Sequence, residues 1–209
     1  MDPQPGTQAA ATRRPSRVGQ WLAQRRVSQW WKAGLAAVLA IAALFGGLDR
    51  VDNTATPFAP GEEFSDGQFL LTVDRARLVE ELRGGGRVVG RETPGRSYLG
   101  VVATLRNDGT TPGRLRNELD LRGVPDDMFY GVFRLRDGSP IPALGPGLTE
   151  ELVFAWQVPA GALRQGSAIT IRVWKKSLKQ LMVTYGGKEW LDSLTDYGVT
   201  ELVVGAPSP

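Results

Sequence analysis

The most constraining feature of the sequence is an uncharged, apolar segment over residues 33–48, which reads AGLAAVLAIAALFGGL. A helix in a soluble core usually shows one apolar stripe, whereas this segment is apolar on every side. Its sixteen residues fall short of the roughly 20 that span a bilayer, but Trp30 and Trp31 lengthen the apolar stretch. Lys32 is compatible with a membrane span at this position, because a lysine can extend its ammonium to the lipid headgroups. The pattern predicts a transmembrane helix over residues 33–48.

Charge is distributed unevenly about this segment. Residues 1–32 contain six basic residues and one acidic residue, a net charge of +5, and the rest of the chain contains 19 basic and 21 acidic residues, a net charge of −2. Basic flanks are retained on the cytoplasmic side of a membrane. We therefore expect a single-pass protein of the plasma membrane, with a cytoplasmic N-terminus and an extracytoplasmic C-terminal domain.

The basic tail divides into two parts. Residues 1–16 are rich in Pro, Gln, Ala and Thr, which is typical of disorder. Residues 18–31 mix arginines with apolar side chains, which predicts either a helix on the inner membrane surface or a continuation of the membrane helix into the cytosol. The residues expected at the membrane interface are Trp21, Arg25, Arg26, Trp30, Trp31 and Lys32.

A cleaved signal peptide is the alternative for the apolar segment, because such peptides also join a basic start to a short apolar region. The basic region here is 32 residues long, and no clear small-x-small cleavage site closes the apolar run. Ala55 offers only a weak match. We therefore prefer an uncleaved anchor.

Cysteine and histidine are both absent from the sequence. This excludes disulfides, Cys/His zinc sites, cysteine nucleophiles and Ser-His-Asp triads within the chain. The net negative charge that follows the tail argues against a nucleic-acid-binding domain, and the basic tail itself suits anionic lipid. We expect no catalytic residues, cofactor or metal, and no nucleic-acid partner.

After a linker over residues 49–63, the pattern changes to short alternating runs separated by turns, with Asp-Gly pairs at residues 108–109 and 137–138. The expected strands are residues 69–73, 99–105, 115–121, 129–135, 151–158, 169–173 and 199–204. About seven or eight such strands predict an all-β, antiparallel immunoglobulin-like sandwich over residues 64–206. Residues 188–194 are the one later stretch whose spacing suits a short helix.

Three stretches carry a family resemblance: FSDGQFLLTVDRARL, YLGVVATLRNDGTTPG and GPGLTEELVFAWQVPAGAL. They resemble the telokin-like, or immunoprotective extracellular, immunoglobulin-like domains of bacterial surface lipoproteins and membrane-anchored proteins. The resemblance covers residues 64–175 and consists of turn and core patterns. It implies a sandwich fold and an extracytoplasmic location, and that family has no shared catalytic residues. The lipobox cysteine of the lipoprotein members is absent here.

One group of residues is a candidate for partner contact: Trp174, Lys175, Lys176 and Lys179. Cations beside an aromatic ring suit phosphate-bearing wall polymer or lipid headgroups, although lysines at the end of a strand give the same pattern. Among the paired carboxylates, Asp126 and Asp127 beside Asp120 are the best calcium candidate, and a solvated surface is the expected alternative.

These observations favour a non-enzymatic envelope protein of a high-GC bacterium, whose sandwich binds a membrane-protein or cell-wall partner. The alternative is an extracytoplasmic small-ligand-binding or sensory module. It requires an exposed aromatic pocket, for which the available residues are Trp156, Trp174, Tyr185, Trp190 and Tyr197. An enzyme is a third possibility and needs carboxylates that converge in a cleft.

Overall fold

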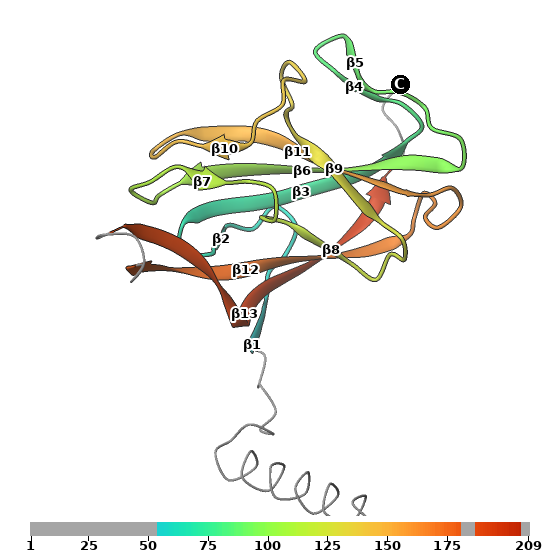
Figure 1. Ribbon diagram of the computed structural model, residues 1–209. Helices are drawn as coiled ribbons and strands as arrows, with labels where there is room; N and C mark the ends of the chain where they lie inside the picture. The colour runs from blue at the N-terminus through green and yellow to red at the C-terminus, as the bar shows by residue number, and fades with distance from the viewer. Residues whose placement is uncertain (1–53, 181–186, 206–209) are drawn as a thin grey trace, which may run out of the picture. The chain divides into compact units, whose positions relative to one another are not determined.

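Alternating apolar residues form the strands of two packed β-layers (Figure 1). Successive side chains in a strand point to opposite faces, so Leu99, Val101, Ala103 and Leu105 lie on one face, and all four are fully buried. The computed structural model describes residues 54–180 and 187–205. The predicted basic tail and membrane segment lie outside these residues. Within them, no helix is long and apolar enough to cross a membrane.

The described residues form thirteen strands. Their bounds are β1 (Thr54–Pro57), β2 (Phe64–Ser65), β3 (Phe69–Val79), β4 (Leu82–Gly84), β5 (Arg87–Gly90), β6 (Arg96–Asn107), β7 (Gly113–Arg114), β8 (Asp120–Arg122), β9 (Met128–Arg134), β10 (Ala143–Leu144), β11 (Thr149–Pro159), β12 (Ala168–Gln180) and β13 (Lys188–Gly205).

The strand order in the larger sheet is β8-β12-β13-β3-β6-β11-β9, with β1 added to β13 and β2 added to β3. One layer contains β1, β8, β12 and most of β13, and the other contains β2, β3, β6, β9 and β11 (Figure 1). Two pairs, β1 with β13 and β13 with β3, are parallel, which differs from the purely antiparallel prediction. The long β13 causes the second, because its last residues leave one layer and join β3 of the other.

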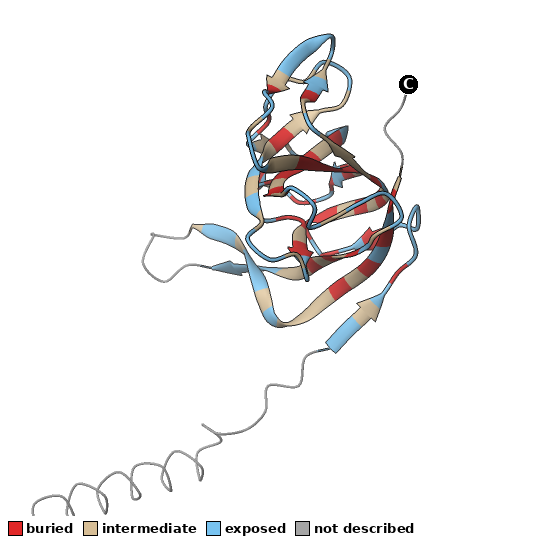
Figure 2. Ribbon diagram, turned by 90° about the vertical axis from the view of Figure 1, so that its right-hand side faces the viewer, coloured by how far each residue is buried: buried red, intermediate tan, exposed pale blue. Residues whose placement is uncertain are grey.

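The inward faces of the two layers form the core, and its buried residues appear as red segments along the strands in Figure 2. Phe69, Phe154 and Ile171 are its largest fully buried side chains from β3, β11 and β12. A second, smaller cluster lies on the outer face, where Leu82 of the β4–β5 hairpin is packed near Tyr98. The hairpin turns at Gly85 and Gly86, whose positive φ angles of +57° and +76° suit a two-residue turn.

Three segments differ from the sequence-based expectations. Residues 188–194 lie in strand β13, and residues 188–192 pair with residues 176–180 of β12, so the helix prediction is wrong. Residues 115–119 form a loop between β7 and β8. The sandwich also begins before residue 64, since β1 pairs with β13 and the Phe58 ring stacks on Phe64 at 4.7 Å.

Candidate binding site

A two-stranded ribbon extends from the sandwich and carries Lys176, a charged residue whose side chain is almost completely buried. We call this ribbon the arm and define it as residues 176–180 of β12 and residues 188–192 of β13, which pair in antiparallel register. Figure 2 shows it protruding from the rest of the sandwich. The register shifts between Trp174 and Lys176, and this irregularity turns Lys176 toward the sandwich.

The ammonium of Lys176 lies between two buried carboxylates. Its Nζ atom is 2.5 Å from Asp66 Oδ2, 2.7 Å from Glu118 Oε1 and 2.6 Å from Glu118 Oε2. The side chain of Lys176 is 9% exposed, and those of Asp66 and Glu118 are 0% exposed. We call these three residues the ion triad. It joins the arm to the sandwich.

Local backbone structure positions the triad. Asp66 lies between β2 and β3, where its Oδ1 atom accepts hydrogen bonds from the backbone N–H groups of Gln68 and Phe69. The backbone N–H of Lys176 also donates to the carbonyl oxygen of Asp66. Gly67 has a φ of +108°, and a side chain there would collide with the Lys176 carbonyl. The triad therefore depends on backbone contacts as well as on charge.

The triad holds two carboxylates for one ammonium, and this imbalance perturbs its protonation. Burial raises the pKa of Glu118 well above its ordinary value, and the charge of Asp66 raises it further, against the opposing effect of Lys176. Burial acts to lower the pKa of Lys176, but Glu118 and Asp66 outweigh burial and raise it. Lys176 therefore stays charged at neutral pH, while burial favours the protonated form of Glu118.

Two residues of the triad, Glu118 and Lys176, line a notch of about 510 Å³ between the arm and the sandwich. Arg114 and Arg116 line the notch from the sandwich side, and neither forms an ion pair within residues 54–180 and 187–205. Trp190 lines the arm side. Its indole N–H is buried and has no hydrogen-bond partner among the described residues.

A second hollow, of about 310 Å³, combines aromatic rings with carboxylates. Its aromatic residues are Phe129, Trp156 and Trp174, and its acidic residues are Asp120, Asp127 and Asp192. Burial, followed by the nearby charge of Asp120, raises the pKa of Asp127. In the part of the chain that the structure describes, no three acidic side chains are grouped as metal ligands, so the suggested calcium site at Asp126 and Asp127 gains no support.

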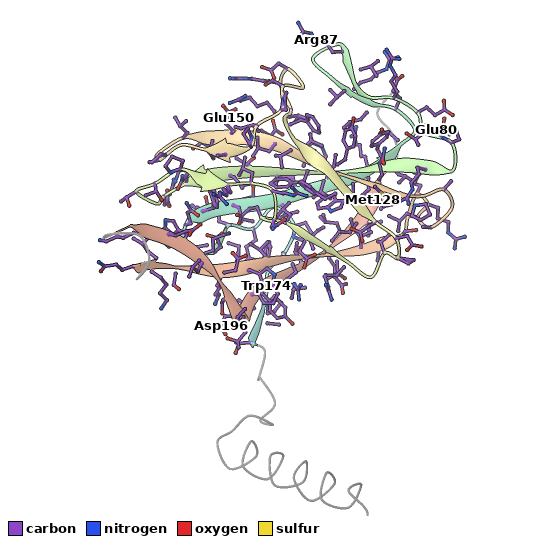
Figure 3. The ribbon with its side chains drawn as sticks, viewed as in Figure 1. Glu80, Arg87, Met128, Glu150, Trp174 and Asp196 are labelled. Carbon is purple, nitrogen blue, oxygen red and sulfur yellow. The ribbon has the colours of Figure 1, made fainter. Side chains whose placement is uncertain are left out.

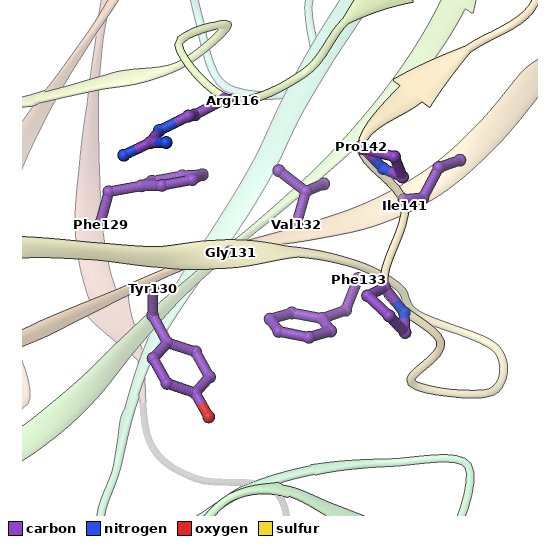
Figure 4. A pocket seen from close by; sticks show the side chains of 9 residues that line it. Arg116, Phe129, Tyr130, Gly131, Val132, Phe133, Ile141 and Pro142 are labelled. Carbon is purple, nitrogen blue, oxygen red and sulfur yellow. The ribbon is translucent and has the colours of Figure 1, made fainter.

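The third hollow, of about 590 Å³, lies along β9 and is mainly apolar (Figure 4). Its lining residues are Arg116, Phe129, Tyr130, Gly131, Val132, Phe133, Pro140, Ile141 and Pro142. Figure 4 shows Phe129 and Val132 on one side of the strand and Tyr130 and Phe133 on the other. Arg116 lines all three hollows, so it marks the point where they meet.

The structure separates the four residues predicted to contact a partner. Trp174 packs under the guanidinium of Arg172, at 4.0 Å from the ring centre, and against the edge of Tyr197. Lys179 is exposed and Lys175 is half-buried. Lys176 differs from the prediction, because its ammonium is held inside the ion triad.

The predicted aromatic pocket is also divided. Trp156, which is buried, and Trp174 both line the second hollow, whereas Trp190 lines the notch. Tyr185 lies outside the described residues, as do the predicted membrane-interface residues. Sequence reasoning missed Asp66, Glu118 and Arg116. An Asp-Gly turn signal marks Asp66, whereas no local pattern distinguishes Glu118 or Arg116 from surface residues.

Comparisons with known proteins add little to this description. No model of a known protein family matches the sequence, and no curated protein matches it. A crystal structure of an uncharacterised β-sandwich protein from Clostridium difficile 630 is similar, with a TM-score of 0.48 and 9% sequence identity. The similarity covers 72% of this chain and 95% of that one.

Proposed function

We propose that this chain is a non-enzymatic, single-pass membrane protein whose extracytoplasmic β-sandwich binds a membrane-protein or cell-envelope partner along strand β9. The apolar hollow beside β9 is the observation that carries the proposal. Aromatic residues, methionine and arginine are enriched at protein interfaces, and this surface offers Tyr130, Met128 and Arg116 together. Met128 is 54% exposed, although its side chain is large and apolar.

Strand β9 also offers backbone groups to a partner. It is the last strand in the order of its sheet and pairs with β11 on one side only. On the other side, residues 139–141 bond to Val132 and Arg134, whereas no described strand covers Met128–Gly131. An extended segment can add to such an edge by backbone hydrogen bonds. We therefore expect a strand of the partner, with an apolar side chain for the hollow and a carboxylate for Arg116.

The membrane anchor and the family belong to the proposal as well. The apolar segment over residues 33–48 and the basic tail support the anchor and its orientation. The two-layered β-architecture is compatible with the resemblance to telokin-like immunoglobulin-like domains. Spheroplast shaving tests the location: an added protease is expected to digest the sandwich and to leave the tail attached to the membrane.

Site-specific photo-cross-linking in cells tests the partner site. A photoreactive residue at Met128 of the full chain is expected to give a discrete adduct in the membrane fraction. The matched control position is Val203, which is 66% exposed and lies on β13 of the opposite layer. Arg116→Glu should abolish the Met128 adduct without unfolding the protein, because Arg116 is exposed and makes no ion pair with another described residue.

Two results would contradict the proposal. One is equal cross-linking from Met128 and Val203, which would show that β9 is not a preferred contact. The other is a Met128 adduct that persists unchanged in Arg116→Glu. That result would show that Arg116, the basic residue lining the hollow, takes no part in binding the partner.

The second hollow favours a second function, that of a small-ligand module. Aromatic faces beside carboxylates suit an organic cation, and Asp127 and Asp192 form no ion pair with another described residue. Choline is a suitable probe, with tryptophan fluorescence as the readout. Saturable quenching that disappears in Trp174→Ala supports this alternative, whereas a linear response in both proteins excludes choline-like cations.

A further inference from the structure

Leu194 is the most exposed large apolar side chain of the described residues, at 86%. It lies in β13 at a point where four residues, 193–196, oppose the single residue Lys175 of β12. We call residues 193–196 the knuckle. Because the partner strand supplies only one residue there, the extra chain must bulge away from the ladder. The bulge explains how a strand residue reaches such high exposure.

The knuckle is an ordered bend. The side-chain Oγ of Ser193 accepts hydrogen bonds from the backbone N–H groups of Thr195 at 3.2 Å and Asp196 at 2.9 Å. Local bonds of this kind from a serine hydroxyl to the following backbone N–H groups fix a tight bend. The structure therefore holds Leu194 outward in a defined conformation.

Strand β1 connects the knuckle to the predicted membrane segment by a short stretch of chain. Thr54 pairs with Asp196, so the first described residue lies beside the knuckle. Figure 3 labels Asp196 at the lower bend of β13 in that view, with Trp174 just above it. Only residues 49–53 separate Thr54 from the end of the predicted membrane segment. Even fully extended, this connection spans roughly 20 Å.

We propose that the Leu194 knuckle inserts into the surface of the bilayer leaflet on the side of the sandwich. This inference rests on the proposed membrane anchor. The rings of Trp174 and Tyr197 pack against each other beside the knuckle, and such rings are common at membrane interfaces. The short connection keeps the knuckle close to lipid, at an effective concentration on the order of millimolar, so that a weak contact suffices.

The contact is apolar rather than electrostatic. Near the knuckle, the single positive charge of Lys175 is outnumbered by the acidic residues Asp192 and Asp196 at the two ends of the bulge. The guanidinium of Arg172 is paired with Asp120. Anionic headgroups therefore gain little from this surface. The contact is expected in zwitterionic and in anionic bilayers alike, and it would fix the orientation of the sandwich relative to the membrane.

Fluorescence quenching in vesicles tests this inference. The chain has no cysteine, so Leu194→Cys gives one labelling site for an environment-sensitive fluorophore. The full chain is reconstituted into phosphatidylcholine vesicles, with and without phosphatidylglycerol, that contain nitroxide-labelled acyl chains. We expect a blue shift and at least twofold stronger quenching at position 194 than at the control Val203→Cys, in both lipid mixtures.

A label at Leu39→Cys, inside the predicted membrane segment, separates two kinds of failure. Quenching at 39 but equal quenching at 194 and 203 overturns the knuckle contact and leaves the anchor intact. No quenching at 39 overturns the anchor and hence the proposed function. A blue shift at 194 without quenching indicates a protein contact, which also overturns the lipid contact.

Hydrogen exchange checks the result without a fluorophore. For the full chain in vesicles, compared with detergent, the amide groups of the knuckle should exchange several-fold more slowly, and Leu194→Asp should abolish this protection. Residues 201–203 serve as the internal control. Equal protection in Leu194→Asp and in the unsubstituted chain would contradict lipid insertion by this side chain.

Discussion

Replacing Lys176 by methionine is the sharpest test of the ion triad. The substitution keeps the length of the side chain but leaves Asp66 and Glu118, both 0% exposed, without their ammonium. Removing one partner of a buried ion pair costs about 3–5 kcal/mol, because the remaining charge stays buried. We therefore expect Lys176→Met to lower the free energy of unfolding by about 3–5 kcal/mol at pH 7.

Urea denaturation of the full chain in mild detergent, followed by tryptophan fluorescence, measures this loss. The matched control is Lys179→Met on the exposed part of the arm, for which a change within about 0.5 kcal/mol is expected. The reasoning would be refuted if the two variants had free energies of unfolding within about 1 kcal/mol of each other, since that value lies within the usual range for single substitutions.

The pH dependence gives an independent check on the triad. The pKa of Glu118 is raised in the folded state, so its contribution to stability is fully present below its unfolded pKa and is lost as pH rises through its folded pKa. Glu118→Gln removes this titration. We expect the unfolding free energy of this variant to fall less than that of the unsubstituted chain as pH rises from about 4.5, the ordinary value for the carboxyl group. Parallel curves would contradict the raised pKa.

Three further predictions concern packing and the binding surface. Gly67→Ala should destabilise the fold by about 1–3 kcal/mol in urea denaturation, because its φ of +108° and the nearby Lys176 carbonyl leave no room for a side chain. Phe154→Ala should cost about 3–5 kcal/mol by the same assay, since the ring is fully buried between the layers. Arg116→Glu should leave the free energy of unfolding within about 0.5 kcal/mol of that of the unsubstituted chain, while abolishing the Met128 cross-link. A destabilisation by Arg116→Glu as large as that of Phe154→Ala would show a structural role for Arg116 instead.

The central strands could be predicted from the sequence because their side chains alternate between core and surface. Leu152, Phe154 and Trp156 all face the core, as the pattern of β11 indicates. The arm could not be predicted in this way. Trp190, Leu191 and Leu194 have helix-like spacing, but pairing with β12 overrides that local preference.

The candidate site was harder to predict than the fold. Lys176 lies 110 residues from Asp66 and 58 residues from Glu118 in the sequence, so no local motif connects them. The basic character of Lys176 was evident, but the bulge that turns it inward depends on the register of β12 and β13. Arg116 gains its importance only because the loop between β7 and β8 places it where three hollows meet.

The central claim is that a transmembrane helix anchors the chain and that the sandwich lies on the extracytoplasmic side of the membrane. Labelling of a single cysteine tests this claim most directly. Val203 is exposed and the chain has no cysteine of its own, so Val203→Cys provides one accessible thiol. A membrane-impermeant maleimide should label this variant in intact spheroplasts, and the labelled product should remain in the membrane pellet after alkaline carbonate extraction. Labelling that requires permeabilised cells, or a labelled product released by carbonate, would contradict the account.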